Sequence, residues 1–204
     1  MAFDEEAGEV VLFGGAASRS GQSLGDTWLF NGDAWRPISG AGPQPRRYAA
    51  LAYDPTLKGC VLNGGSEDDD SVWAFGDSRL FRDGAWTPLS SGFDVEPHDD
   101  HSLAYHRSAK RLVMFGGLAG PHGVRVREAS GWRAVEAPPL PPRSQCSPLT
   151  WDDGLQGLVF HGGEARHGGP QFGVTWVLRL RAAQEVKPSL EHGEYNLGWG
   201  YKEC

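Results

Sequence analysis

The feature that most constrains the fold is a segment that occurs four times without a gap: AFDEEAGEVVLFGG, AYDPTLKGCVLNGG, AYHRSAKRLVMFGG and TWDDGLQGLVFHGG. In each copy a polar residue, at position 4, 54, 106 or 152, precedes a glycine pair by ten residues. The pairs begin at Gly14, Gly64, Gly116 and Gly162, at intervals of 50, 52 and 46 residues. A period of this length predicts a repeat architecture of four similar units.

Each unit reads as a series of short β-strands. An apolar stretch ends in an aromatic residue, a polar turn follows, and a second apolar stretch enters the glycine pair, which predicts a β-hairpin. A third strand is expected at residues 26–30, 71–75 and 174–178, where each segment contains a tryptophan. A later tryptophan, Trp35, Trp86 or Trp132, opens a fourth strand. Four antiparallel strands per repeat are typical of a propeller blade.

These elements resemble the kelch family and the propeller of the galactose-oxidase type. The resemblance rests on the glycine pairs, the DTW-like third strand, the later tryptophan and the PR elements of PQPRRYAALAYD and PPRSQCSPLTWD. It implies an all-β propeller whose glycines allow close approach between blades and whose tryptophans fill the space between them. The expected repeats span about 1–47, 48–99, 100–147 and 148–180, followed by a tail at 181–204.

Two repeats depart from the pattern. The third has GVRVREASGW in place of a tryptophan-containing third strand, which predicts an irregular outer part. The first has only Met1, Ala2 and Phe3 ahead of its turn, so its innermost strand is expected to be nearly missing. Kelch propellers commonly have more than four blades. The ring is therefore expected to be completed by the tail, with residues 195–201 as the candidate strand, by a larger ring, or by a homodimer formed through exposed strand edges.

Composition and charge exclude several classes of partner and site. The net charge of -7 argues against nucleic acid, because phosphate binding requires clustered Lys and Arg. No apolar stretch approaches the length of about 18 residues that a membrane helix needs. The N-terminal segment lacks the pattern of a secretion signal, which favours a cytoplasmic protein. The three cysteines are widely spaced and match neither a disulfide framework nor a zinc motif.

The loops between the second and third strands (bc) and between successive repeats (da) share one face, which is called the bc/da face here. They vary in length and are charged, as functional loops in repeat scaffolds tend to be. Candidate binding residues on this face are Arg19, Arg47, Asp100, Arg143 and Arg166. The kelch resemblance implies that such arginines bind acidic peptides, since a guanidinium offers a fork of donors to a carboxylate. Arg46 and Arg47 equally fit an ion pair between blades.

Histidines on the same face suggest a metal. The segment DVEPHDDH, residues 94–101, brings carboxylates close to two histidines, and imidazole with carboxylate suits a divalent or copper ion. The candidate ligands are His98, His101, His122 and His167. A solvated acidic loop is the simpler interpretation of this segment. Two metal-dependent kelch classes do not fit: no local motif assigns the cysteines as in copper radical oxidases, and Ala104 stands where the iron-dependent specifier pattern beginning at Glu96 and Asp100 requires histidine.

No catalytic set is complete in the sequence. We therefore expect a non-enzymatic binding or scaffold module that recognises a protein or peptide through the bc/da face. The alternatives are a metal-dependent enzyme of the oxidase or lyase type on the same face, and a carbohydrate-binding protein that uses its exposed aromatic and acidic side chains.

Overall fold

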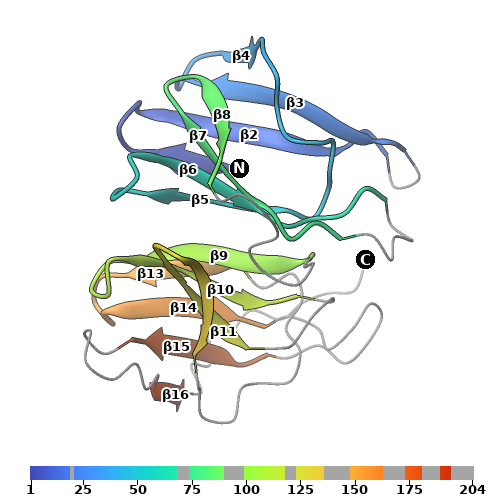
Figure 1. Ribbon diagram of the computed structural model, residues 1–204. Coiled ribbons are helices and arrows are strands. Elements are labelled where there is room, and N and C mark those ends of the chain that lie inside the picture. Colours follow the sequence, from blue (N-terminus) through green and yellow to red (C-terminus); the bar gives the residue numbers. More distant parts are fainter. Residues whose placement is uncertain are drawn as a thin grey trace, which may run out of the picture.

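The computed structural model describes residues 1–18, 21–68, 74–89, 99–117, 123–135, 148–162 and 173–180, together with the backbone of 189–193. These residues form four antiparallel four-stranded sheets arranged in a ring like a four-bladed propeller (Figure 1). The all-β prediction is thereby confirmed. Among the described residues there is no helix of the length and hydropathy needed to cross a membrane.

The strands of each sheet follow one another in chain order, as a meander requires. The first sheet contains β1 (Ala2–Asp4), β2 (Glu9–Ala16), β3 (Ser23–Phe30) and β4 (Trp35–Ile38). The second contains β5 (Ala50–Asp54), β6 (Gly59–Asn63), β7 (Ser78–Arg82) and β8 (Ala85–Pro88). The third contains β9 (His101–His106), β10 (Arg111–Gly116), β11 (Val124–Glu128) and β12 (Gly131–Val135). The fourth contains β13 (Leu149–Asp152), β14 (Gly157–His161), β15 (Thr175–Arg179) and β16 (Ser189–Gly193).

The third strand of the second repeat is not where the tryptophan predicted it. Residues 71–73 lie outside the described residues, and Ala74 forms only an isolated bridge with Ser66. The strand that pairs with β6 is β7, seven residues later than the expected start. The reason is the alternation of the side chains: Ser78 and Leu80 are buried in β7, as Thr27 and Leu29 are in β3. The third strand of a sheet therefore lies where a small hydroxyl residue and a leucine, two positions apart, can both be buried. A tryptophan between them is not required, since Arg79 holds that position in β7.

The third repeat is also more regular than expected. β11 pairs with β10 and β12 in continuous register, although it has no tryptophan. Val124 and Val126 are fully buried, so an alternating pair of valines supplies the apolar face that the sheet needs. The first strand is short, as expected, with three residues in β1.

The C-terminal part of the chain completes the fourth sheet. β16 pairs along β15 from Ser189 to Gly193 and is the outermost strand. The candidate strand at residues 195–201 lies outside the described residues.

The core lies between neighbouring sheets. One buried cluster joins the first and second sheets, another the second and third, and a third the third and fourth. Two tryptophans take part and donate across these interfaces, Trp86 Nε1 to Thr27 Oγ1 at 2.8 Å and Trp132 Nε1 to Ser78 Oγ at 3.1 Å. The expectation that tryptophans fill the space between blades is confirmed for both residues.

The glycine pairs make room for the chain that connects one sheet to the next. At Gly14 a Cβ atom would lie 2.5 Å from the carbonyl oxygen of Arg46, and at Gly65 one would lie 2.6 Å from that of Arg47. Both glycines have a positive φ, 63° at Gly14 and 92° at Gly65, a backbone conformation that residues with a Cβ atom rarely adopt. The pairs therefore hold the da segment of residues 39–49 against both sheets and place Arg46 and Arg47 between them.

Candidate binding face

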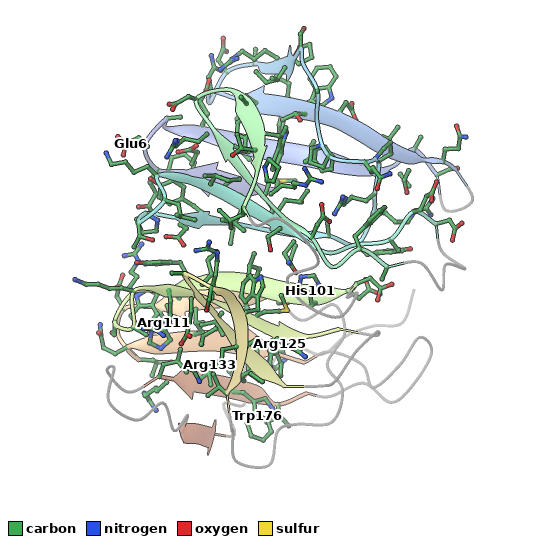
Figure 2. All side chains as sticks on the ribbon, viewed as in Figure 1. Glu6, His101, Arg111, Arg125, Arg133 and Trp176 are labelled. Carbon is green, nitrogen blue, oxygen red and sulfur yellow. The ribbon has the colours of Figure 1, made fainter. Side chains whose placement is uncertain are left out.

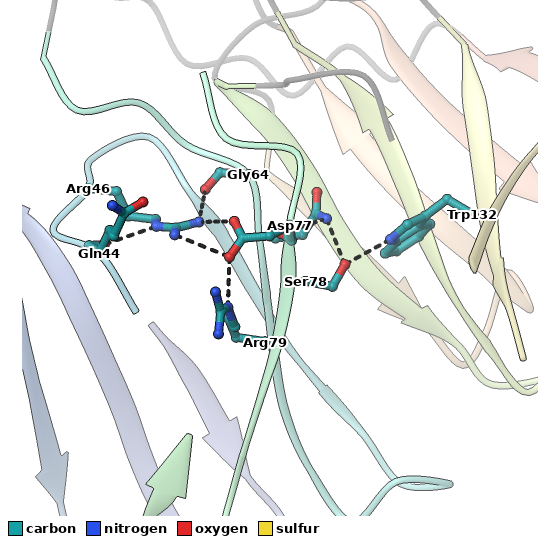
Figure 3. Close-up of polar contacts among 8 residues, drawn as sticks. Gln44, Arg46, Gly64, Asp77, Ser78, Arg79 and Trp132 are labelled. Carbon is teal, nitrogen blue, oxygen red and sulfur yellow. Dashed lines mark hydrogen bonds and ion pairs between the residues drawn. The ribbon is translucent and has the colours of Figure 1, made fainter. Parts of the chain in front are cut away.

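The two arginines of the da segment are anchored inside the protein. Arg46 is 1% exposed, and its Nη1 donates to Asp77 Oδ1 at 2.6 Å and to the carbonyl oxygen of Gly64 at 3.0 Å (Figure 3). Its Nε donates to the carbonyl of Gln44, and its guanidinium stacks over the Phe75 ring at 4.0 Å. This contact is the ion pair between blades that the sequence allowed as an alternative role for Arg46.

Asp77 is the centre of this network. Its Oδ2 also accepts from Arg79 Nε at 2.7 Å. Burial alone would raise the pKa of this carboxyl group, but the hydrogen bonds and positive charges of Arg46 and Arg79 outweigh burial and lower the pKa below its ordinary value. Asp77 therefore stays ionised and balances a buried cation.

Arg47 is 5% exposed and faces the neighbouring loop. Its Nε donates to Ser23 Oγ at 3.1 Å and its Nη2 donates to the carbonyl oxygen of Gly21. Its backbone pairs with that of Ser66 through two hydrogen bonds of 2.9 Å. In this position the guanidinium supports the bc loop of the first sheet, the backbone of Arg47 supports that of the second, and the side chain presents little surface to a ligand.

A hollow of about 460 Å³ opens above Arg47 on the bc/da face. Its wall is made of Gly21, Gln22, Ser23, Pro45, Glu67 and Asp68. Ser23 Oγ donates to the carbonyl oxygen of Glu67 at 2.5 Å, and Ser66 Oγ donates to that of Asp68 at 3.1 Å. These bonds fix the backbone of both loops while Glu67 and Asp68 remain exposed. The hollow is therefore acidic, with a rigid hydrogen-bonded floor.

Of the other predicted residues, Asp100 and His101 are described. Asp100 is half-buried and has a φ of 53°. Its backbone N–H donates to the carbonyl oxygen of Tyr48, in the segment that precedes β5, at 3.1 Å. His101 is 6% exposed and begins β9, at the end of the sheets opposite to Glu6 (Figure 2). The remaining candidates lie outside the described residues: Arg19, His98, His122, Arg143, Arg166 and His167.

The metal hypothesis depends mainly on those undescribed histidines. Within the part of the chain that the structure describes, no three His, Cys, Asp or Glu side chains are grouped as metal ligands would be. Cys60 is fully buried, and burial raises the pKa of its thiol to about 12, so this cysteine is a packing residue in the protonated form.

Among the other hollows of the described residues, two invite comparison with this one. One, of about 370 Å³, lies between the first and second sheets on the opposite face, but its charges are engaged with each other: Arg36 with Glu9 at 2.8 Å and Lys58 with Glu6 at 3.1 Å. The other, of about 570 Å³, is lined by the innermost strands of all four sheets and is the central channel. The bc/da hollow differs from both in its position, beside the da segment that carries Arg46 and Arg47.

Sequence reasoning missed Asp77, although a signal for it exists. GDTWLF at 25–30 and GDSRLF at 76–81 align from glycine to phenylalanine, and this alignment marks β3, β7 and the aspartate together. A marker based on tryptophan alone could not find it. Compared with protein-family models and with curated proteins, the chain matches none.

Proposed function

We propose that the chain is a kelch-type propeller module that binds a protein or peptide on its bc/da face, and that the hollow above Arg47 receives a basic side chain of that ligand. The kelch assignment is supported by the four repeats and by the interface role of the glycine pairs and tryptophans. The choice of a basic ligand revises the expectation of an acidic one.

The observation that carries the proposal is the position of Glu67 and Asp68. Both side chains are exposed at the rim, while the neighbouring carbonyl oxygens accept from Ser23 and Ser66. Such a rim offers acceptors and negative charge, which suit a lysine ammonium or an arginine guanidinium. The guanidinium of Arg47 bonds to Gly21 and Ser23, which are lining residues of the hollow.

The rigidity of the floor favours binding. Arg46 and Arg47 are each held by several hydrogen bonds to two sheets, so the loops lose little conformational freedom when a ligand binds. We infer that the two arginines position the site and do not contact the ligand, and that the specificity for charge comes from the two carboxylates.

The test is binding of fluorescent peptide pools that differ only in charge. We expect the lysine- and arginine-rich pool to bind, the acidic pool not to bind, and affinity to fall with added salt because the rim charges are exposed. Glu67→Gln should weaken binding of the basic pool about three- to tenfold, as expected for a loss of about 1 kcal/mol. Asp33→Asn is the matched control, since it also removes one exposed negative charge but lies in the turn between β3 and β4.

Binding of the acidic pool, or equal loss in both variants, would contradict the proposal. An equal loss of affinity in the two variants would indicate that the peptides respond to the net charge of the protein. A preference for acidic peptides would indicate that arginines of the bc/da face bind the ligand.

A further inference from the structure

The turns between the first and second strands of neighbouring sheets contact each other at a repeated position. Between the first and second sheets, Lys58 Nζ donates to Glu6 Oε1 at 3.1 Å. Between the third and fourth sheets, Ser108 Oγ donates to Gln156 Oε1 at 3.3 Å. Glu6 and Ser108 occupy equivalent positions in the repeat, as do Lys58 and Gln156, whose φ angles are 53° and 51°. The repeat therefore places a side-chain contact between successive sheets at this turn.

The same contact is missing between the second and third sheets, where the equivalent residues are Thr56 and Lys110. Lys110 has the turn conformation of Lys58, with φ angles of 52° and 53°. Thr56 carries no charge, and its hydroxyl donates to Asp54 Oδ1 at 2.6 Å. Within the residues that the structure describes, the ammonium group of Lys110 has no hydrogen bond or ion pair. It therefore lacks the carboxylate that Lys58 has.

Arg127 is a second cation without a partner at this interface. It lies on β11 directly opposite Trp132, at the position that Phe81 holds opposite Trp86 in the second sheet. The equivalent residues of the first and fourth sheets are apolar as well. Arg127 is half-buried, and the described part of the chain offers its guanidinium no hydrogen bond or ion pair. A partly buried charge of this kind is stabilised by an anion.

Both cations line one hollow between the second and third sheets. Its volume is about 420 Å³, and its wall includes Thr56, Lys110, Arg111 and Arg127. Arg111 lies at the same end of the sheets as Glu6 (Figure 2). The hollow therefore opens on the face opposite to the bc/da face.

This hollow has an excess of positive side chains. Three cations and two carboxylates line it: Lys110, Arg111, Arg127, Asp54 and Glu128. Glu128 Oε1 is shared, since it accepts from Arg133 Nε at 2.7 Å and from Arg111 Nη1 at 3.5 Å. The hollow between the first and second sheets has the opposite balance, with three cations and four carboxylates. The excess at the second interface is thus a local departure in a chain whose net charge is -7.

The aspartate of the turn is compatible with a further carboxylate beside it. Asp54 is 2% exposed, and its Oδ1 accepts from the N–H and the hydroxyl of Thr56 at 2.8 and 2.6 Å. In the first sheet the equivalent Asp4 Oδ1 accepts from the N–H of Glu6 at 3.0 Å, and Glu6 still pairs with Lys58. The fold therefore accommodates a carboxylate next to the turn aspartate.

We propose that this hollow binds a carboxylate group of a ligand, which takes the place beside Lys110 that Glu6 takes beside Lys58. The repeat identifies the occupant, because the chain itself supplies a carboxylate at the equivalent lysine. The bound carboxylate accepts from Lys110 Nζ and from the guanidinium of Arg127, whose fork of donors suits two oxygens. The site lies on the other face from the hollow above Arg47 and does not depend on the function proposed for that hollow.

Acetate is the probe, because it carries one carboxylate and little else. Sodium acetate, sodium chloride and sodium phosphate are titrated separately into isotope-labelled protein, and the amide and arginine Nε–H signals are followed by NMR. We expect acetate to cause saturable shifts at Lys110 and Arg127. Lys110→Gln and Arg127→Leu introduce the residues of the fourth repeat, Gln156 and Leu178, and should each weaken acetate binding about tenfold, as expected for one hydrogen bond to a charged group. The same spectra show that each variant is folded.

Lys58→Gln is the matched control, because Lys58 holds the equivalent position but is paired with Glu6. This variant should bind acetate as the wild type does. Thr56→Glu supplies the missing carboxylate from the chain itself, so it should abolish acetate binding and raise the melting temperature at low salt.

Four results would each overturn the proposal. They are the absence of saturable shifts with acetate, shifts of the same size with chloride, an equal weakening in Lys58→Gln, and binding of phosphate without binding of acetate. The second would indicate a response to ionic strength, and the last would indicate a phosphate site.

Discussion

At the residue scale, His106 occupies the position that aspartate holds in the other three repeats. Asp4, Asp54 and Asp152 each accept backbone N–H groups of the following turn, and His106 Nδ1 does so from Ala109 at 3.2 Å. Its Nε2 faces the N–H of Leu180 at 3.0 Å. A neutral imidazole has one acceptor nitrogen, so the tautomer decides which of the two bonds forms, and a protonated ring forms neither.

His106 should make the protein sensitive to mild acid. The ring is fully buried, and burial lowers its pKa to about 4, below the ordinary value near 6.5 in the unfolded chain. The unfolded state therefore binds the proton more readily, and the stabilisation present above about pH 6.5 is lost as the pH falls toward 4, by about 3 kcal/mol in total. Urea unfolding at a series of pH values should show this loss.

The matched variant is His106→Asn, which keeps an acceptor for the turn but does not titrate. Its free energy of unfolding should change much less between pH 7 and 5 than that of the wild type. Parallel curves for the two proteins would show that other groups cause the acid sensitivity.

At the element scale, the da segment and β7 are joined by a buried charge pair. Asp77→Asn would leave Arg46, which is 1% exposed, without a compensating charge, and should cost about 3 kcal/mol in the free energy of unfolding. The lowered pKa of Asp77 means that the wild-type pair contributes fully above the ordinary carboxyl pKa near 4 and is lost as the pH falls below it. Denaturant unfolding at neutral pH measures the cost.

Glu9→Gln is the control for this prediction. The pair of Glu9 with Arg36 has a similar distance, 2.8 Å, but the Arg36 side chain is 52% exposed. Its loss should cost less than 1 kcal/mol, because solvent screens an exposed pair. Similar costs for the two variants would show that burial does not set the strength of the Arg46 pair.

The elements themselves were largely predictable from the sequence, and the site was less so. The four hairpins follow from the repeated segment, because alternating apolar residues and a polar turn specify them locally. β7 was misplaced because a tryptophan served as the marker where the structure requires a buried hydroxyl and leucine. Arg47 was expected either to bind a ligand on the bc/da face or to form an ion pair between blades. The structure turns its guanidinium toward Gly21 and Ser23, a contact across 24 or more residues that no local pattern encodes.

At the scale of the whole molecule, the apolar core is divided among the interfaces between sheets. Each of the three buried clusters joins one sheet to the next along the chain, and no cluster of the described residues joins the fourth sheet to the first, its neighbour in the ring. The three buried clusters between neighbouring sheets therefore supply most of the apolar contribution to the free energy of unfolding.

Two phenylalanines, one on the second strand of the fourth sheet and one on the third strand of the first sheet, test how far burial between sheets sets stability. Phe160 is 1% exposed in the cluster of the third and fourth sheets, and Phe160→Ala should cost about 3–5 kcal/mol. Phe30 is half-buried and belongs to none of the three clusters, so Phe30→Ala should cost clearly less. Urea unfolding of the two variants measures both costs, and equal costs would show that burial between the third and fourth sheets does not set the contribution of Phe160.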